Sequence, residues 1–489
     1  MKKLRGFGIP ISLKTLNRTE VKHELHELQE RFVFVPTDKA GNNISIVCKK
    51  IYIDSLLKEV SFSTDQDVKD GTYVRINDSI DDIVNKHYED VKNWKADIAD
   101  KQRQLPFLYW IPKMHKNPPK QRFIAASSCC STKSTSSIIT RCLKLIQQAH
   151  KIYCDRIKTY TGFQLMWIIQ NSHELHDMLS KKGRNLATYD FSTLYTSIPH
   201  DKLKDKLKEV ITRAFKGMNK KYITVSNYSA KWVNKQTKSN LISCKLLLDM
   251  INWLVDNTYV TVGNSVFRQT IGIPMGTDCA PYLANLFLYA YEFEFLNSLL
   301  KQKEFDTLFK FNKCYRYIDD LLAVNNDNLI NDFKDKIYPP ELKLNCEDKN
   351  DQEVTYLDLS LKINKDSILY KLYDKRDKFG FPIVNFPNLT GNIPTGQSYG
   401  VFISQLVRYS RCCQNFVDFK ERTSNLVERL LKQGFKFPKL CHTFNKFAKK
   451  YSHLLRKYKE FYNYDLNLVL HSGNGKYVPT SLKLYSRNT

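Results

Sequence analysis

Two adjacent aspartates, Asp319 and Asp320, interrupt a stretch of residues that favour β-strands. Before them Tyr315 and Tyr317 alternate with other side chains, and residues 321–324 form the continuous apolar run that is typical of a buried strand. We therefore expect a β-hairpin with both carboxylates at its tip. Because Asp tolerates turn geometry, an ordinary hairpin turn is an equally good interpretation of this segment taken alone.

A third aspartate, Asp190, ends a predicted strand that begins near residue 185 and then turns through Ser192 and Thr193. An acid at the end of a strand is typical of functional sites. Asp190, Asp319 and Asp320 together can form one carboxylate cluster. Clustered carboxylates repel one another, so divalent cations normally neutralise them, and Mg²⁺ prefers a few carboxylates together with substrate phosphates.

Such a cluster predicts chemistry at a phosphate ester. Two ions about 3.5–4 Å apart form the clamp of polymerases and nucleases, in which one ion activates a hydroxyl and the other stabilises the leaving group. We therefore expect two Mg²⁺ ions, with Mn²⁺ as an alternative metal. Basic side chains must also neutralise the phosphates. Lys113 and Arg122 are the candidates, because they flank a Pro-rich basic loop in residues 105–128; a solvated loop is the alternative.

The 489-residue chain has 76 Lys and Arg against 50 Asp and Glu, a formal net charge of +26. The excess is spread along the chain, which indicates a polyanionic partner, most simply a nucleic acid; ribosomal and membrane-surface proteins are the alternatives. Because no apolar run reaches 18 residues and no secretory leader follows Met1, we expect an intracellular protein without a membrane partner. Twelve cysteines form no CxxC pair, so we expect reduced, mostly buried thiols, with a zinc site as the alternative.

The sequence predicts both strands and helices up to residue 396 and only helices after it. Hairpins are expected over residues 31–48, 105–128 and 258–270, and helices over residues 19–31, 131–153, 241–255 and 328–337. A helix after Pro199 has one apolar face. Residues 216–240 are polar, basic and aperiodic, so we interpret them as a surface insertion. A loop rich in Gly and Pro, residues 271–281, precedes an apolar helix.

The helical region is predicted to contain helices over residues 398–413, 416–432 and 439–462. The last helix has a face with Lys446, Lys449 and Lys450 that suits a nucleic-acid backbone.

The chain resembles the reverse transcriptases of the Penelope-like retroelements, within the telomerase-like group. The residues Tyr317-Ile318-Asp319-Asp320 resemble the YxDD motif, residues 190–195 resemble the first catalytic motif, and residues 272–276 resemble the loop-helix motif that lies between them. Residues 109–113 and 122–124 resemble the two fingers motifs in a form close to telomerase. Residues 38–42, 190–199 and 356–359 fit the Penelope-like group best, and the resemblance covers residues 34–462.

The resemblance implies a role for each matched residue. Asp190 and Asp319 would bind both metals with help from the Phe191 carbonyl, and Asp320 would support the cluster. Lys113 and Arg122 would bind the triphosphate, and Tyr195 would exclude a 2′-hydroxyl. The other implied contacts are Met275 and Gly276 with the nascent base pair, Lys343 as general acid for pyrophosphate, and Tyr373 in a primer grip. Met275 stands where many retroviral enzymes have Gln, which removes a polar contact to the nucleotide.

The resemblance also implies an α+β right-hand polymerase, with fingers in residues 1–182, an antiparallel-sheet palm in residues 183–394 and a helical thumb with a tail in residues 395–489. It would extend a DNA primer with dNTPs on an RNA template, in the nucleus. No GIY-YIG nuclease motif is found, so we expect a nuclease-free or truncated element. A catalytically decayed RNA- or DNA-binding protein is the rival hypothesis. A telomerase-like enzyme with a dedicated RNA is a third hypothesis, but the sequence leaves little room for the large N-terminal RNA-binding region that it requires. The oligomeric state, the copied RNA and the origin of the primer are left open.

Overall fold

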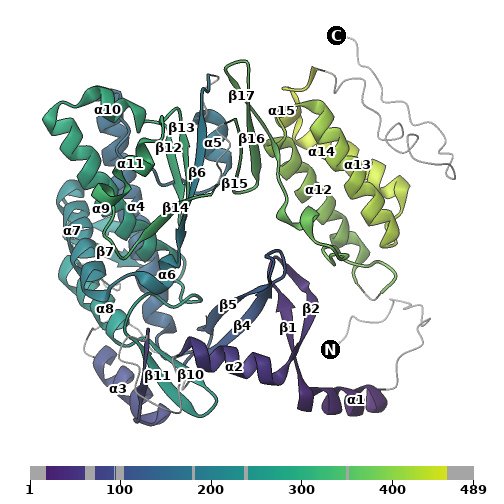
Figure 1. Ribbon diagram of the computed structural model, residues 1–489, viewed down its shortest axis with the longest axis horizontal. Coiled ribbons are helices and arrows are strands. Elements are labelled where there is room, and N and C mark those ends of the chain that lie inside the picture. Colours follow the sequence, from purple (N-terminus) through teal and green to yellow (C-terminus); the bar gives the residue numbers. More distant parts are fainter. Residues whose placement is uncertain are drawn as a thin grey trace. The chain divides into compact units, whose positions relative to one another are not determined.

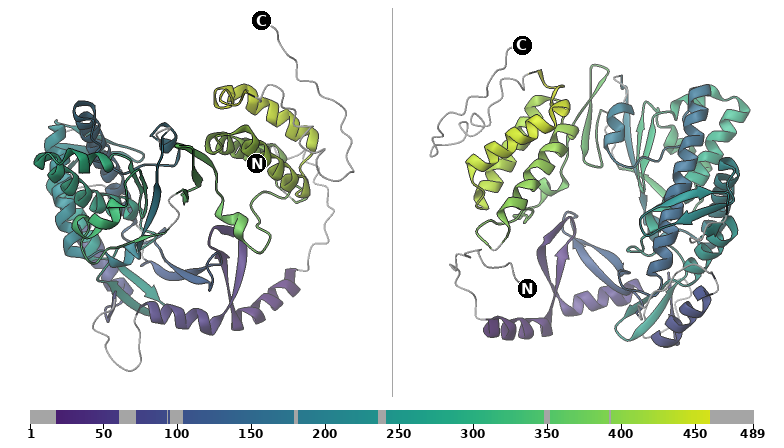
Figure 2. Two further views of the ribbon diagram at one scale, coloured as in Figure 1. Left: turned by 45° about the horizontal axis from the view of Figure 1, so that its top comes forward. Right: turned by 180° about the vertical axis from the view of Figure 1, so that it is seen from behind.

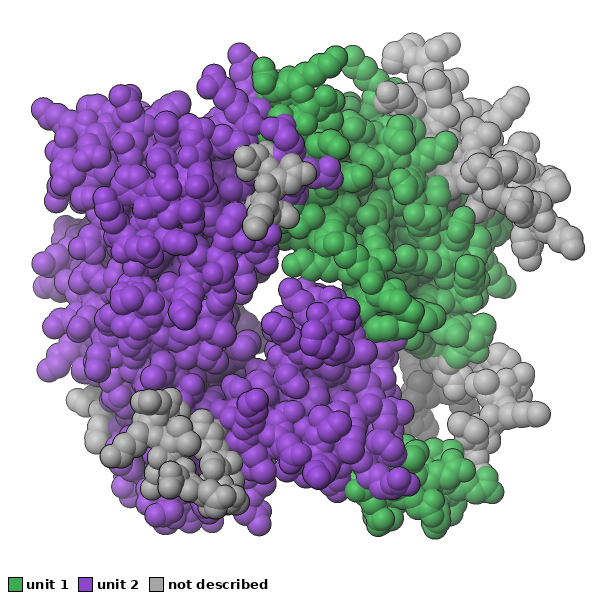
Figure 3. All heavy atoms as spheres, in the orientation of Figure 1, with its two compact units in different colours: residues 1–30, 355–489 green, residues 31–354 purple. Residues whose placement is uncertain are grey.

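The computed structural model describes residues 18–60, 72–92, 94, 104–178, 182–235, 241–347, 352–391 and 393–459. The chain divides into two compact units, which Figure 3 colours separately. The larger unit is residues 31–354, and the smaller unit combines residues 1–30 with residues 355–489. The expected limits at residues 182 and 394 do not coincide with this division. Strands from both sides of residue 182 share one sheet in the larger unit, and residues 355–394 group with the helices that follow them.

Helix α1 (Arg18–Arg31) belongs to the smaller unit up to residue 30, and the larger unit begins at its last residue. The larger unit then contains β1 (Phe32–Thr37), β2 (Ala40–Cys48), α2 (Lys49–Glu59), β3 (Tyr73–Ile76), α3 (Ile80–Lys92), β4 (Phe107–Lys113), β5 (Lys120–Ala126), α4 (Lys133–Thr161), α5 (His173–Met178), β6 (Leu186–Ser192), α6 (Leu194–Ser197), α7 (His200–Met218), β7 (Tyr222–Val225), β8 (Ala230–Val233), β9 (Leu241–Ser243), α8 (Cys244–Asp256), β10 (Tyr259–Val262), β11 (Ser265–Gln269), α9 (Ala280–Gln302), α10 (Phe305–Lys310), β12 (Cys314–Tyr317), β13 (Asp320–Val324), α11 (Leu329–Ile337) and β14 (Lys343–Cys346). The hairpins expected over residues 31–48, 105–128, 258–270 and 313–324 are all confirmed.

The central sheet of the larger unit has the strand order β12-β13-β6-β14, and all of its pairs are antiparallel. Helices α4, α7, α9 and α11 lie on one side of it (Figure 1). Tyr189, Phe191, Leu321 and Leu344 point to that side and are part of the main hydrophobic core. Helix α9 is apolar almost all round, so it is buried at the centre of this layer.

A second sheet has the order β3-β11-β10-β4-β5. It joins the β4–β5 hairpin, expected in the fingers, to the β10–β11 hairpin, expected in the palm, through a parallel contact between Thr261 and Phe107. Helix α2 packs on this sheet, where Tyr52 and Trp110 stack with ring centroids 4.7 Å apart. The expected boundary at residue 182 therefore separates segments that share one sheet.

The interpretation of residues 216–240 as an aperiodic insertion is wrong for the part that the structure describes. Helix α7 continues to Met218, and β7 and β8 then form a hairpin that pairs with β9 in a third sheet. Ile223 on β7 and Ile242 on β9 are fully buried. Four-residue strands are too short for their alternation to stand out from the surrounding lysines. Residues 236–240 lie outside the described residues.

The smaller unit contains β15 (Glu353–Tyr356, at the boundary), β16 (Leu359–Asn364), β17 (Ser367–Leu372), a 3₁₀ helix (Lys375–Lys378), α12 (Thr395–Cys412), α13 (Phe416–Lys432), α14 (Phe437–Lys450) and α15 (Ser452–Leu455). Helices α12 to α14 lie side by side (Figures 1 and 2). The single helix expected over residues 439–462 is wrong, because α14 ends at Lys450 and the short α15 follows Tyr451. Residues after 459 lie outside the described residues.

Two further expectations concern composition. All twelve cysteines lie in the described part of the chain, where none forms a disulfide and most are buried. Within the described ranges, no helix is both long enough and apolar enough to span a bilayer.

Candidate active site

The register of the central sheet brings the predicted acids together. Asp190 on β6 is the direct partner of Asp320 on β13. Directly opposed residues of an antiparallel pair point to the same face, with Cβ atoms about 4.5–5.5 Å apart. Tyr317 pairs with Asp320 and closes a two-residue turn formed by Ile318 and Asp319. The N–H of Phe191 donates to the Asp319 carbonyl at 3.3 Å, so this turn also lies beside β6.

The donor set suits a hard divalent cation that also binds substrate. Within the described residues, no group of three or more His, Cys, Asp or Glu side chains is arranged to hold a metal ion. Mg²⁺, however, is usually bound by one or two carboxylates with substrate phosphates, and not by a cage made of protein alone. Opposed like charges on a sheet destabilise it, so a cation at Asp190 and Asp320 would relieve a repulsion. The residues present therefore fit Mg²⁺.

A fully buried ion pair lies beneath the acidic turn. Arg316 on β12 donates through Nε and Nη2 to the carboxylate of Glu292 on α9, and through Nη1 to Asn285 Oδ1 at 2.8 Å. The same Nη1 donates to the carbonyl of Ile318 at 2.9 Å, and Tyr338 Oη donates to Glu292 at 2.9 Å. Ile318 has a positive φ of 56°. Arg316 thus fixes the backbone of the turn that contains Asp319.

Arg316 and Glu292 were not among the residues predicted to have a role. A signal was present, because each is a charged residue inside an apolar element, and buried charges are normally paired. The pairing itself depends on how β12 packs on α9.

The edge strand β14 adds polar groups to the face of the acids. Asn345 is the partner of Asp190, and Lys343 is the partner of Ser192. The side-chain amide of Asn345 donates to Ser192 Oγ. Lys343 is exposed and lies on the same face as Asp190, two residues along the edge strand. Asn345 was missed by the sequence analysis, since only the register identifies it.

Tyr195 lies close to the acidic turn. It belongs to the short helix α6 that follows β6, and its side chain is half-buried. Burial raises the pKa of Tyr195, and the nearby carboxylate of Asp319 raises it further. The structure therefore brings the predicted gate residue near the predicted metal ligands.

The loop of residues 272–276 joins Tyr195 to the β4–β5 hairpin. The N–H of Ile273 donates to the Tyr195 carbonyl at 2.6 Å, and the N–H of Ala125 on β5 donates to the Met275 carbonyl at 2.7 Å. Gly276 has a φ of 120°, and a Cβ at this position would collide with the carbonyl oxygen of Ala125. Backbone contacts thus connect α6, this loop and β5.

The β4–β5 hairpin presents the predicted phosphate-binding residues. Lys113 pairs with Lys120, and Ile111 pairs with Arg122, so Lys113 and Arg122 are diagonal neighbours on one face. Burial lowers the pKa of Lys113, and the positive charge of Arg122 lowers it further. Such a concentration of positive charge favours binding of an anion.

The remaining predicted residues belong to the smaller unit. Tyr373 follows β17, and its N–H donates to the Asp358 carbonyl at 2.9 Å. Arg422 on α13 donates to the Leu372 carbonyl at 3.1 Å, which links α13 to the hairpin formed by β16 and β17. The three lysines of α14 are exposed and lie on one side of the helix by their spacing: Lys446, Lys449 and Lys450.

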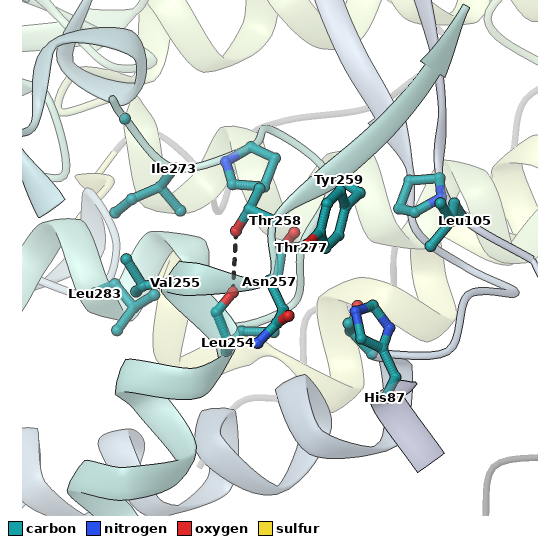
Figure 4. Close-up of a pocket in the computed structure, with 14 residues that line it drawn as sticks. His87, Leu105, Leu254, Val255, Asn257, Thr258, Tyr259, Ile273, Thr277 and Leu283 are labelled. Carbon is teal, nitrogen blue, oxygen red and sulfur yellow. Dashed lines mark hydrogen bonds between the residues drawn. The ribbon is translucent and has the colours of Figure 1, made fainter. Parts of the chain in front are cut away.

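A small cavity lies behind the loop of residues 272–277 (Figure 4). His87 lies on one side of it, and Ile273 and Leu283 lie on the other. Burial lowers the pKa of His87 to about 4, so this side chain is neutral at pH 7. The cavity volume is about 30 Å³, room for about two water molecules. A nucleotide does not fit there, so the face with the acids is the better candidate for a substrate site.

No protein-family model and no curated protein matches the chain. Among solved structures, telomerase from Candida albicans in complex with the TWJ fragment of telomeric RNA aligns with a TM-score of 0.56 and 12% sequence identity, over 92% of this chain and 72% of that chain. Apo telomerase from Candida tropicalis aligns with a TM-score of 0.44 and 11% identity, over 91% of this chain and 70% of that chain. The likeness to the first structure shows the fold alone: the chain folds as an α+β right-hand polymerase.

Proposed function

We propose that the protein is an RNA-directed DNA polymerase that adds dNTPs to the 3′-hydroxyl of a DNA primer. The observation that supports this most is the direct pairing of Asp190 with Asp320, with Asp319 in the adjoining turn. Acids at these positions of a polymerase fold suit two-metal phosphoryl transfer.

The acids form the centre of the proposed reaction. Asp190 and Asp319 would hold two Mg²⁺ ions with help from the Phe191 carbonyl, and Asp320 would support the cluster. Bound Mg²⁺ supplies activation of the 3′-hydroxyl and stabilisation of pyrophosphate.

The surrounding residues of the larger unit hold the nucleotide. Lys113 and Arg122 bind its triphosphate, whose negative charge they neutralise as the bond to pyrophosphate breaks. Tyr195 excludes a 2′-hydroxyl, and Met275 and Gly276 contact the nascent base pair. Lys343 donates a proton to the departing pyrophosphate. Its place beside Ser192, on the face of Asp190, supports that role.

The smaller unit is the proposed thumb together with the primer grip. Tyr373 contacts the primer, and Lys446, Lys449 and Lys450 contact the backbone of the duplex. Their exposure on one helix supports a sequence-independent, electrostatic contact. The net charge of +26 agrees with a nucleic-acid partner, and the Candida albicans neighbour was solved with an RNA fragment.

The finer parts of the proposal depend on motifs. Residues 38–42, 190–199 and 356–359 support an origin in the Penelope-like retroelements, which act on nuclear DNA. The fingers, palm and thumb are proposed at residues 1–182, 183–394 and 395–489, with the fingers and palm sharing one compact unit.

Primer extension tests the proposal. With a DNA primer on an RNA template, Mg²⁺ and dNTPs, the primer should lengthen to the end of the template. Ribonucleotides in place of dNTPs should give little product. Binding of the primer-template with no extension under Mg²⁺ or Mn²⁺ would favour the decayed binding protein instead. Sequencing RNA that co-purifies with the protein tests the telomerase-like alternative, which requires one dominant RNA.

A further inference from the structure

The tip of the β1–β2 hairpin has no role in the function proposed above. It consists of Asp38 and Lys39, and Lys39 has a positive φ of 63°. Asp38 is only 4% exposed, although it lies at a turn. Its backbone N–H donates to the Pro112 carbonyl on β4 at 3.1 Å, so the tip is attached to the β4–β5 hairpin (Figure 1). A buried aspartate at a turn requires a partner for its charge.

The partner is a predicted triphosphate ligand. Asp38 Oδ1 lies 3.3 Å from Arg122 Nη1, in an ion pair whose Arg122 side chain is 39% exposed. The second oxygen, Oδ2, is buried and has no hydrogen-bond partner within the described residues. It lies 3.9 Å from His115 Nδ1, on the loop between β4 and β5. Asp38 thus lies under the cationic face of the hairpin.

This geometry leaves Arg122 available to a second anion. A guanidinium has five N–H donors in a rigid fork. Contact of one end with a buried carboxylate fixes the plane of the fork, while the exposed end is free to donate to phosphate oxygens.

We infer that Asp38 is a positioning residue, which orients the Arg122 guanidinium toward the polyphosphate of the incoming nucleotide. This inference rests on the proposed function only in taking Lys113 and Arg122 as the triphosphate ligands. Its particular claim is that a buried carboxylate from another hairpin sets the affinity for polyphosphate.

Asp38→Asn tests the inference, because it keeps the shape and the backbone hydrogen bond to Pro112 and removes the charge. The KM for dNTPs should rise about tenfold, the scale expected when a charge-assisted contact is misplaced. The kcat should fall by a smaller factor, because Arg122 also neutralises charge in the transition state while the metal ligands are untouched. Asp54→Asn, an exposed acid on α2, is the matched control and should leave both constants unchanged.

A binding assay without primer or template separates this inference from the proposed function. Inorganic tripolyphosphate should bind the Asp38→Asn protein about tenfold more weakly than the wild type. The Arg122→Met variant and the Asp38→Asn/Arg122→Met double variant should bind tripolyphosphate with the same weak affinity, because Asp38 acts through Arg122. A wild type that binds tripolyphosphate in this pattern but extends no primer would contradict the proposed function and leave the inference standing.

Arg122→Lys is the second variant, for the case in which Asp38→Asn fails to fold. One ammonium group cannot contact Asp38 and reproduce the bidentate grip on phosphate, so the same loss of tripolyphosphate affinity is expected. The inference would be overturned if folded Asp38→Asn or Arg122→Lys protein bound tripolyphosphate with wild-type affinity. It would also be overturned if Asp38→Asn weakened binding about tenfold in a protein that already carries Arg122→Met.

Discussion

Asp190 and Asp320 are direct partners across two antiparallel strands, and Asn345 is the partner of Asp190 on its other side. The three side chains therefore form a row across one face of the central sheet, while the other face packs on the helices. Strand register alone brings these distant acids together. Cation binding at this row would offset the repulsion between the two carboxylates.

The buried pair of Arg316 and Glu292 should affect stability and turnover separately. Arg316→Met should lower the free energy of unfolding by about 3–5 kcal/mol, because it leaves the Glu292 carboxylate buried without its partner. The double variant Arg316→Met/Glu292→Leu should regain much of this stability, as apolar replacements of buried pairs often do. It should remain slow in primer extension, because the Ile318 carbonyl has lost its donor. Denaturant unfolding and single-turnover rates measure the two effects; wild-type turnover in the double variant would exclude a positioning role for Arg316.

Gly276 should not tolerate a side chain. Gly276→Ala places a methyl group against the Ala125 carbonyl at a φ of 120°, so we expect a loss of more than about 1 kcal/mol of stability and slower extension. Gly263→Ala is the control, since its φ is also positive at 58° but no atom lies within 4 Å of the added Cβ. Thermal melts of both variants measure the difference. Equal losses would mean that backbone strain, and not the contact with β5, sets the requirement.

Tyr195 should decide which sugar is used. Tyr195→Ala should raise ribonucleotide incorporation and lower deoxyribonucleotide use only modestly, because truncation relieves a clash that only the ribose makes. If Tyr195 is instead ordinary core, the same change should cost roughly 3–5 kcal/mol of stability and leave the ratio of the two activities unchanged. Single-nucleotide extension gives this ratio, and a melting curve is needed beside it. An unchanged ratio in a destabilised protein would rule out the gate.

The lysines of α14 should contribute to salt-dependent binding of the duplex. Each phosphate contact adds about 0.9 to the slope of log affinity against log salt. Replacing Lys446, Lys449 and Lys450 by Ala should therefore lower that slope by up to about three, with little dependence on sequence. A control triple variant changes exposed lysines of the larger unit: Lys208, Lys245 and Lys301. The same slope in the α14 variant and the wild type would show that α14 does not contact phosphate.

Local patterns in the sequence were enough to predict the hairpins. Short-range alternation and turn residues define them, as at Asp319 and at Gly263, where a φ of 58° fits the turn. The order of the motifs was enough to predict that Asp190 lies near the acidic turn, and the strand register places Asp190 directly beside Asp320.

Features that depend on long-range packing were not predicted. The strands at residues 222–233 are stabilised by pairing with β9 and by burial of Ile223, which four residues cannot signal. The break at Tyr451 also escaped prediction, since the periodicity continues through it. Arg316 and Asn345 acquire their roles only through neighbours remote in sequence, Glu292 and Asp190.

Removing either of two carboxylates, Asp190 or Asp319, should abolish most of the proposed two-metal catalysis. Asp190→Asn and Asp319→Asn should each slow nucleotide addition at least about 100-fold, because each removes a preorganised charge at the reacting phosphate. Both variants should bind the primer-template as the wild type does, since basic surfaces hold its backbone. The matched control is Asp306→Asn, an exposed acid on α10, which should extend at the wild-type rate. The decisive measurement is the single-turnover rate of dNTP addition with Mg²⁺ on an RNA template. Rates that are at least about 100-fold below the wild type in both site variants, with a wild-type rate in the control, would support the two-metal polymerase. Near-normal turnover in either site variant would contradict it.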